Sequence, residues 1–166
     1  KNFYIIEWNE KLKILKQIIF ALENIHLQEI IHRKFHSGNI FCENEYDIVI
    51  GTSRTKRQTY TKALDMYSFG MIMWELTTGR RPFWDQCYDA DLKIQIIDGV
   101  RPPIITNAPK GYIGLMQQCW DFDPNKRPTA SNAHEIINKI ILNEENNPTK
   151  IIKSSDIGPI LVSSSR

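Results

Sequence analysis

The chain has 166 residues, enough for one domain with a hydrophobic core and short for two. Apolar residues make up 42%, charged residues 24%, and the net charge is +2; this ordinary globular composition gives no support for a nucleic-acid-binding protein. Cys42, Cys87 and Cys119 are far apart and odd in number, which argues against a disulfide framework or a zinc site. No apolar run reaches membrane-spanning length, so we expect a cytoplasmic protein that makes no contact with a membrane.

The N-terminal part of the chain predicts one long helix and a small hairpin. Residues 8–28 form an amphipathic pattern, in which apolar residues recur at spacings of three and four, and Asn9 is the expected N-cap. A loop over 31–39 follows. The segments 39–42 and 46–50 are short, apolar and rich in β-branched and aromatic residues, as in a hairpin. Residues 51–60 are polar and aperiodic and predict a loop.

Four further helices are predicted in the remainder. Residues 61–78 are apolar on nearly every face, which places this helix at the centre of the fold, and Gly79 ends it. The others are 89–99, capped by Asp89 and ended by Gly99; 109–121, beginning at Pro109; and 129–143, with an isoleucine-rich face. Trp74, Trp84 and Trp120 are expected to pack in the core or to take part in lobe packing. Residues 144–166 are polar and serine-rich and predict a disordered tail after a mainly α domain over 1–143.

Three motifs in the same order resemble those of a protein kinase. The stretch "HRKFHSGN" matches the catalytic-loop signature H-R-D-L-x-x-x-N at His32, Arg33 and Asn39. The stretch "DMYSFGMIMWELTTGRRPF" resembles the central helix of the tyrosine-kinase-like group, with Asp65 as its signature acid. The stretch "CWDFDPNKRPT" resembles the motif at the end of the kinase domain, with Arg127 as its characteristic basic residue. The resemblance implies a kinase C-terminal lobe, a helical bundle with one small hairpin, with the N-terminal lobe and most of the activation segment absent.

The resemblance also implies ATP and Mg²⁺ as cofactors, but several of the family's parts are missing. No G-x-G-x-x-G and no V-A-I-K-like strand precede the first helix, and the D-F-G region reads "YDIVIGTSR". If Gly51 is the motif glycine, the metal-binding acid falls on Val49 or is deleted, and Asp47 is the nearest acid. Lys34 occupies the position of the catalytic base, where an ammonium has donors and no acceptor.

The loop residues each have two interpretations. Lys34 is either a base whose neutral form burial favours or a solvated cation, and the open polar loop favours the second. Asn39 either holds a magnesium ion weakly or closes the loop by hydrogen bonding. Phe41 is either the apolar floor under the adenine or a simple core residue. Arg33 either grips a phosphorylated hydroxyl of residues 51–60 or has no such role.

Two further residues carry structural expectations. Asp65 lies on a buried helix, where a carboxylate needs partners unless it faces solvent, and the resemblance implies that it accepts the backbone N–H groups near His32 and Arg33. Arg127 lacks the glutamate of an A-P-E motif, and we expect a partly exposed and unpaired guanidinium.

Two functional hypotheses follow from the resemblance. The chain is either a catalytically inactive kinase-like lobe that acts as a protein-interaction module, with a kinase lobe or signalling protein as partner, or a fragment of a protein kinase that binds ATP and phosphorylates proteins.

Overall fold

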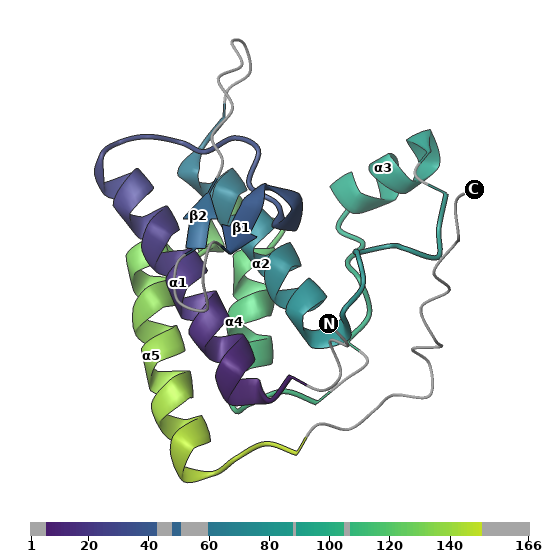
Figure 1. Cartoon of the computed structure of the whole chain (residues 1–166). Helices are drawn as coiled ribbons and strands as arrows, with labels where there is room; N and C mark the ends of the chain where they lie inside the picture. The colour runs from purple at the N-terminus through teal and green to yellow at the C-terminus, as the bar shows by residue number, and fades with distance from the viewer. Residues whose placement is uncertain (1–5, 43–47, 51–59, 88, 105–106, 151–166) are drawn as a thin grey trace, which may run out of the picture.

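The computed structural model describes residues 6–42, 48–50, 60–87, 89–104 and 107–150. These ranges contain five α-helices and one two-stranded antiparallel hairpin (Figure 1), which confirms the mainly α prediction with a single hairpin. The helices are α1 (Trp8–Leu27), α2 (Lys62–Thr78), α3 (Ala90–Ile97), α4 (Tyr112–Cys119) and α5 (Ala130–Asn146). The strands are β1 (Ile40–Cys42) and β2 (Ile48–Ile50), and two short 3₁₀ helices are η2 (Ser37–Asn39) and η3 (Pro124–Lys126). Within the same ranges, no helix combines the length and the apolarity needed to cross a membrane.

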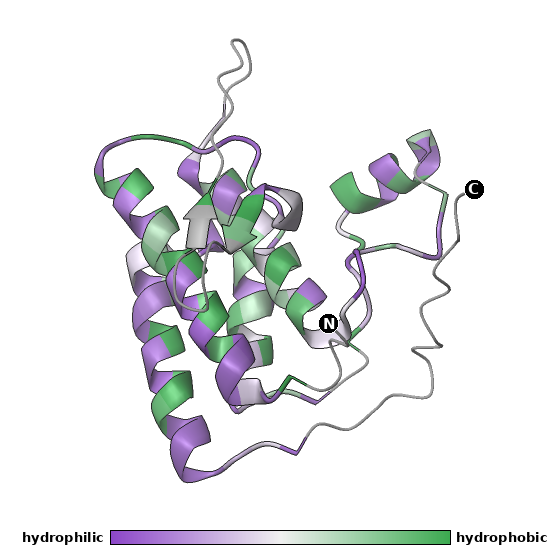
Figure 2. Ribbon diagram, in the orientation of Figure 1, coloured by the Kyte–Doolittle hydropathy of each residue, from purple (hydrophilic) through white to green (hydrophobic). Residues whose placement is uncertain are grey.

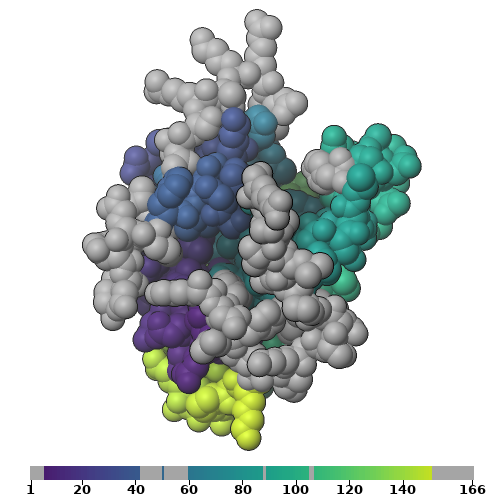
Figure 3. Space-filling model, turned by 45° about the vertical axis from the view of Figure 1, so that its right-hand side comes forward, coloured from purple at the N-terminus to yellow at the C-terminus, as the bar shows by residue number. Residues whose placement is uncertain are grey.

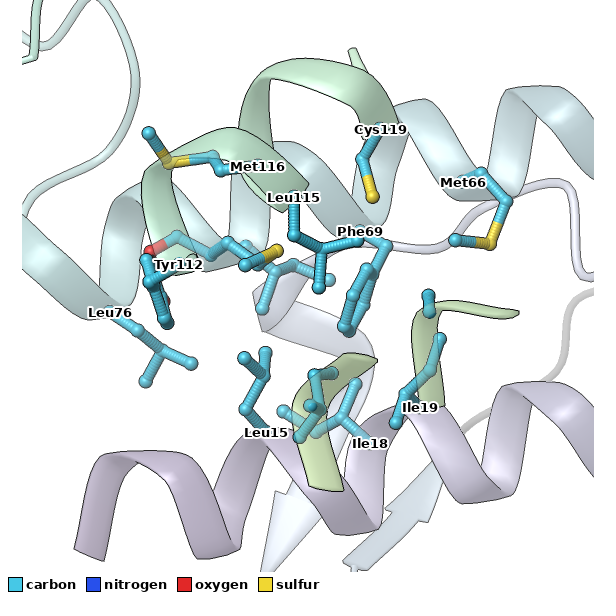
Figure 4. Close-up of a cluster of buried hydrophobic side chains, with 14 of the residues drawn as sticks. Leu15, Ile18, Ile19, Met66, Phe69, Leu76, Tyr112, Leu115, Met116 and Cys119 are labelled. Atoms are coloured by element: carbon cyan, nitrogen blue, oxygen red, sulfur yellow. The ribbon is translucent and has the colours of Figure 1, made fainter. Parts of the chain in front are cut away.

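Helices α1, α2, α4 and α5 enclose one hydrophobic core. Helix α1 lies beside α5, and α2 packs against α4 (Figure 1). In the close-up of Figure 4, Leu15, Ile18 and Ile19 of α1 point toward Phe69 of α2 and Leu115 of α4. Each fully buried side chain of this size contributes about 1.5–3 kcal/mol relative to its exposed state, so the bundle is stabilised mainly by these contacts.

Helix α2 is the centre of the fold, as its apolar sequence predicts. Both apolar and polar side chains along it are buried, from Asp65 to Thr78, and Gly79 ends it in the left-handed conformation at φ 68°. Gly70 lets α4 approach closely, because a Cβ atom there would lie 3.0 Å from Cys119 Cβ and 3.1 Å from the Met116 carbonyl oxygen. The buried Tyr112 hydroxyl ties the two helices together by donating to the Met73 carbonyl at 2.8 Å.

Helix α3 stands apart from the bundle (Figures 1 and 3). The Asp89 carboxylate caps it as predicted, accepting the Leu92 N–H at 2.9 Å. Leu92 is the one buried side chain of this helix, while Ile94 and Ile97 are exposed. Figure 2 shows the resulting mixture of hydrophobic and hydrophilic residues on α3, in contrast to the inward-facing hydrophobic sides of the bundle.

The hairpin covers one side of α1, next to the loop over residues 31–39. Its strands pair in the register Ile40 with Ile50 and Cys42 with Ile48, which confirms the predicted hairpin. Apart from Tyr60, the loop predicted over 51–60 lies outside the described residues, as do Asp47 and Gly51.

Three local predictions are wrong. Helix α1 begins at Trp8 with Glu7 in the N-cap position, so Asn9 lies inside the helix. Helix α4 begins at Tyr112, because Gly111 adopts φ 90° immediately before it and the chain from Pro109 has not yet entered the helix. Trp84 is 53% exposed and stacks on the Arg80 guanidinium, so of its two interpretations the one that places it in the core is wrong.

The predicted start of the tail is also wrong. Helix α5 continues through Asn146, and Glu144 is buried within its last turns. The Glu144 carboxylate accepts the Thr149 N–H and hydroxyl, both at 2.7 Å, so the chain is structured as far as this contact. The remainder of the predicted tail, residues 151–166, lies outside the described residues.

Candidate functional site

The loop over residues 31–39 buries two of its side chains and exposes most of the others. It follows α1 through Glu29, whose φ is 56°, and reaches Arg33 at φ 73°, a conformation that costs a non-glycine residue about 1–2 kcal/mol. His32 and Phe35 point inward and are buried, with their rings packed edge to face at 5.3 Å. Arg33 and Lys34 are exposed. The loop therefore has an apolar inner side and a cationic outer side.

Asp65 on α2 holds this loop through its backbone. Its Oδ2 accepts the His32 N–H at 2.8 Å, and its Oδ1 accepts the Arg33 N–H at 3.0 Å. These two hydrogen bonds confirm the role predicted for Asp65. The residue is 1% exposed, and a buried carboxylate needs such donors to offset its lost hydration.

His26 is a third partner of this carboxylate that the sequence did not reveal. The buried His26 Nε2 lies 3.0 Å from Asp65 Oδ2, at the last turn of α1. The amphipathic pattern around His26 contains no signal that predicts an acidic partner 39 residues later. The exposed pair of Lys62 and Glu29, at 2.8 Å, joins the segment between α1 and this loop to the start of α2, and Lys62 lowers the pKa of Glu29.

Lys34, at the position of the catalytic base, is hydrogen-bonded through its backbone to the side-chain amide of Asn39. The Asn39 side-chain NH₂ donates to the Lys34 carbonyl at 2.8 Å, which closes the loop as one of the two interpretations of Asn39 expects. The Lys34 side chain itself is exposed, in agreement with an open polar loop. Residue 34 thus supports the loop through its backbone while its ammonium extends into solvent.

Phe41 on β1 is 54% exposed, which contradicts its interpretation as a simple core residue. The side chain is therefore available on the surface beside the loop, as the alternative interpretation requires. The described residues contain no group of three His, Cys, Asp or Glu side chains that could hold a metal ion. Asn39 alone offers one amide oxygen, and both oxygens of Asp65 are engaged by donors, so the described residues do not fit the carboxylate-rich set that Mg²⁺ prefers.

Arg127 is paired, contrary to the prediction. Its Nε donates to the Asp121 carbonyl at 2.8 Å, and its Nη1 donates to the Ala63 carbonyl at 2.9 Å, so two backbone oxygens bind it in place of the missing glutamate. Its guanidinium also lies 5.2 Å from the centre of the Tyr67 ring, and Arg101 lies 5.0 Å from that ring. Burial, followed by repulsion from Arg101, lowers the pKa of Arg127. Arg127 therefore fastens the segment after α4 to the start of α2.

Comparisons with known proteins identify a kinase-related sequence. Residues 52–137 match the family model described as protein tyrosine and serine/threonine kinase. The chain is 29% identical over 153 residues to a protein of Acanthamoeba polyphaga mimivirus named as a serine/threonine-protein kinase/receptor, R818. It is 30% identical over 170 residues to cyclic GMP-binding protein C of Dictyostelium discoideum, and 27% identical over 164 residues to the serine/threonine/tyrosine-protein kinase HT1 of Arabidopsis thaliana.

These alignments cover most of this chain and a smaller part of each relative. They include 76%, 81% and 84% of the chain, but 9%, 6% and 42% of the three relatives, respectively. The chain therefore corresponds to one part of each relative.

Proposed function

The chain belongs to the protein tyrosine and serine/threonine kinase family, and from this premise we propose that it is a catalytically inactive kinase-like domain that acts as a protein-interaction module. Its partner is another protein, a kinase lobe or a signalling protein, in the cytoplasm. The observation that carries the proposal is the base position: Lys34 is exposed there, and its own carbonyl accepts the Asn39 amide.

Phosphoryl transfer by this family needs a group that accepts or orients the proton of the substrate hydroxyl, together with Mg²⁺ ions that hold the phosphates of ATP. An ammonium at position 34 has three donors and no acceptor, so it cannot take up that proton. The Asn39 NH₂ group is engaged with the Lys34 carbonyl, and the remaining amide oxygen is a weak magnesium ligand on its own. These features support the proposal that the loop is retained as a structural element and has lost its catalytic role.

The second candidate is a fragment of a kinase that binds ATP and phosphorylates proteins. Two observations favour it. The Asp65 carboxylate accepts the His32 N–H at 2.8 Å and the Arg33 N–H at 3.0 Å, which holds these two residues of the loop in place. Relatives such as HT1 are named as kinases. The family's usual cofactors, ATP and Mg²⁺, would then bind beside the exposed Phe41.

A thermal-shift measurement separates the two candidates. A ligand that binds only the native state raises its unfolding midpoint, by an amount that grows with ligand concentration. We expect no rise with ATP and Mg²⁺ at millimolar concentration, and no transfer of labelled phosphate to the chain itself or to a mixed protein substrate. The same two measurements on the Lys34→Asp variant provide the matched comparison. The side chain at this position is exposed, so its replacement does not disturb the core. A concentration-dependent rise for the wild-type chain, accompanied by phosphate transfer, would establish the second candidate instead.

A further inference from the structure

A groove with a volume of about 400 Å³ lies between the segment that follows α3 and the segment that follows α4. Pro102 and Trp120 line it and are buried. Ile104 and Phe122 also line it, but they are 44% and 67% exposed, so they stand at its opening. The Phe122 ring reaches toward Gly99, where an added Cβ would lie 4.0 Å from Phe122 Cδ2. The groove is therefore an apolar depression that is open to solvent.

Arg101 joins the two walls of this groove. Its Nε donates to the Trp120 carbonyl at 2.8 Å, and its Nη1 donates to the Ile96 and Val100 carbonyls at 3.0 and 2.9 Å. Its guanidinium also lies 5.0 Å from the centre of the Tyr67 ring. Because these contacts hold both walls, the groove is formed before anything binds in it, which lowers the entropy that binding costs.

Exposed apolar surface extends from the groove to the end of α3. Ile97 and Val100 lie on either side of Gly99 in the chain, and both are exposed. Single exposed apolar side chains are ordinary, but Ile97, Val100, Ile104 and Phe122 lie in or next to one groove, which is typical of a binding surface. A cavity of about 150 Å³ accommodates benzene, so this groove accommodates at least two aliphatic side chains.

The chain that leaves α5 is held beside the groove. The Asn107 side-chain NH₂ donates to the Lys150 carbonyl, across 43 positions of sequence. Asn107 is three residues from Ile104, so their Cα atoms are at most about 11 Å apart. The seven residues from 151 to 157 span up to about 25 Å when extended. The chain beyond Lys150 can therefore reach the opening of the groove.

Residues 157–162 are the apolar part of the segment that follows, which lies outside the described residues. They read "IGPILV", between the polar stretches "KSSD" over 153–156 and "SSSR" over 163–166. A proline inside a helix removes a hydrogen bond and clashes with the preceding turn, so Pro159 favours an extended conformation. An extended aliphatic peptide is the kind of occupant that an apolar groove of this width accepts.

We propose that residues 157–162 bind as an extended segment in this groove of their own chain, with their aliphatic side chains against Ile104, Trp120 and Phe122. The contact of Asn107 with Lys150 makes the chain's own segment the favoured occupant, because a short tether gives it an effective concentration of about 1 mM. When bound, the segment withdraws this apolar surface from other proteins. The proposal is independent of the catalytic state of the loop over 31–39, which contributes no residue to the groove.

The test uses the 166-residue chain and a fluorescein-labelled peptide of residues 155–164, whose binding is followed by fluorescence anisotropy. The tail variant combines Ile160→Asp with Leu161→Asp, which changes both sides of an extended segment because successive side chains point in opposite directions. We expect the peptide to bind the tail variant with a Kd of about 0.1 mM or lower, and the wild-type chain at least tenfold more weakly, because the tethered segment at about 1 mM occupies the groove there.

Matched variants locate the binding. Ser154→Asp combined with Ser155→Asp adds the same charges outside residues 157–162 and should bind the peptide as the wild-type chain does. Phe122→Ser, added to the tail variant, should weaken peptide binding at least tenfold. Phe20→Ser, at another exposed position that lies on α1, should weaken it less than threefold when added to the same variant.

Three results would overturn the proposal: no binding of the peptide to the tail variant, equal binding to the tail variant and the wild-type chain, and binding that Phe122→Ser leaves unchanged. Sedimentation velocity at the same protein concentrations should show a monomer for both chains. A dimer of the wild-type chain that the tail variant does not form would place the segment in the groove of a second copy, and this result would also contradict binding within one chain.

Discussion

The replacement of Asp65 by alanine tests whether the loop depends on this one carboxylate. Asp65 accepts the His32 N–H at 2.8 Å and the Arg33 N–H at 3.0 Å, and it lies 3.0 Å from His26 Nε2. Alanine leaves these three groups without their acceptor. It also removes the contact that holds Arg33 at φ 73°. We therefore expect Asp65→Ala to lower the stability of the whole domain and to release the loop.

The expected magnitude follows from the groups left behind. A buried donor that loses its acceptor costs about 1–3 kcal/mol, and removing one member of a buried charged network typically costs about 3–5 kcal/mol. We take about 3–5 kcal/mol for Asp65→Ala, a large share of the roughly 5–15 kcal/mol that stabilises a typical domain. For a chain of this size each kcal/mol shifts the midpoint by about 2–4 °C, so the expected decrease is about 6–20 °C.

Thermal and urea unfolding followed by circular dichroism provide the measurement, and hydrogen exchange at the His32 and Arg33 amides locates the effect. Asp65→Asn keeps one carbonyl oxygen as an acceptor and should give an intermediate decrease with faster exchange at one of the two amides. Glu135→Ala, at an exposed position on α5, should change the free energy of unfolding by less than about 0.5 kcal/mol. An Asp65→Ala midpoint equal to that of Glu135→Ala would show that the loop is held by other contacts.

Three further predictions concern the bundle. Gly70→Ala should lower the unfolding midpoint, because its Cβ would lie 3.1 Å from the Met116 carbonyl oxygen. The control Gly114→Ala has open space around the new Cβ and should raise the free energy of unfolding by up to about 1 kcal/mol through helix propensity. Equal effects of the two variants would refute the close approach of α2 and α4. Burial lowers the pKa of Lys11 to about 8 from 10.5, so the unfolded chain binds more protons between these values and stability should rise with pH across that interval. Lys11→Met should flatten this rise in pH-dependent unfolding experiments, and an unaltered profile would assign the rise to other groups. Burial raises the pKa of the Cys119 thiol to about 12, so iodoacetamide at pH 8 should alkylate the exposed Cys87 and leave Cys119 unmodified in the native protein, as peptide mass spectrometry would reveal.

The helices were predictable where a local rule governs the structure. The spacing of apolar residues in α1 and α5 depends only on residues within two turns, and Gly79 and Asp89 act on the helix ends next to them. The prediction for α4 failed at its start, because Gly111 at φ 90° turns the chain just before Tyr112, and a proline two residues earlier gave a competing local signal.

The site was predictable only as far as the resemblance to a known motif extended. The Asp65 contacts with the loop backbone follow from that resemblance and from the need to satisfy a buried carboxylate. The contacts of Arg127 with Ala63 and of His26 with Asp65 do not, because they join residues 64 and 39 positions apart and depend on how the helices pack. The lack of an A-P-E glutamate predicts an unpaired Arg127, but a guanidinium has five donors, and backbone carbonyls accept hydrogen bonds from them as carboxylates do.

The loop shows how a fold can be separated from its chemistry. Asp65 binds the loop through the N–H groups of residues 32 and 33, and Asn39 binds it through the carbonyl of residue 34. Every one of these contacts uses the backbone, which any side chain at position 34 would supply equally. An aspartate and a lysine at this position therefore leave the loop equally well held, although only the aspartate can accept a proton. Stability consequently places little constraint on the residue that the reaction depends on most, and the loop keeps its conformation with Lys34 in place.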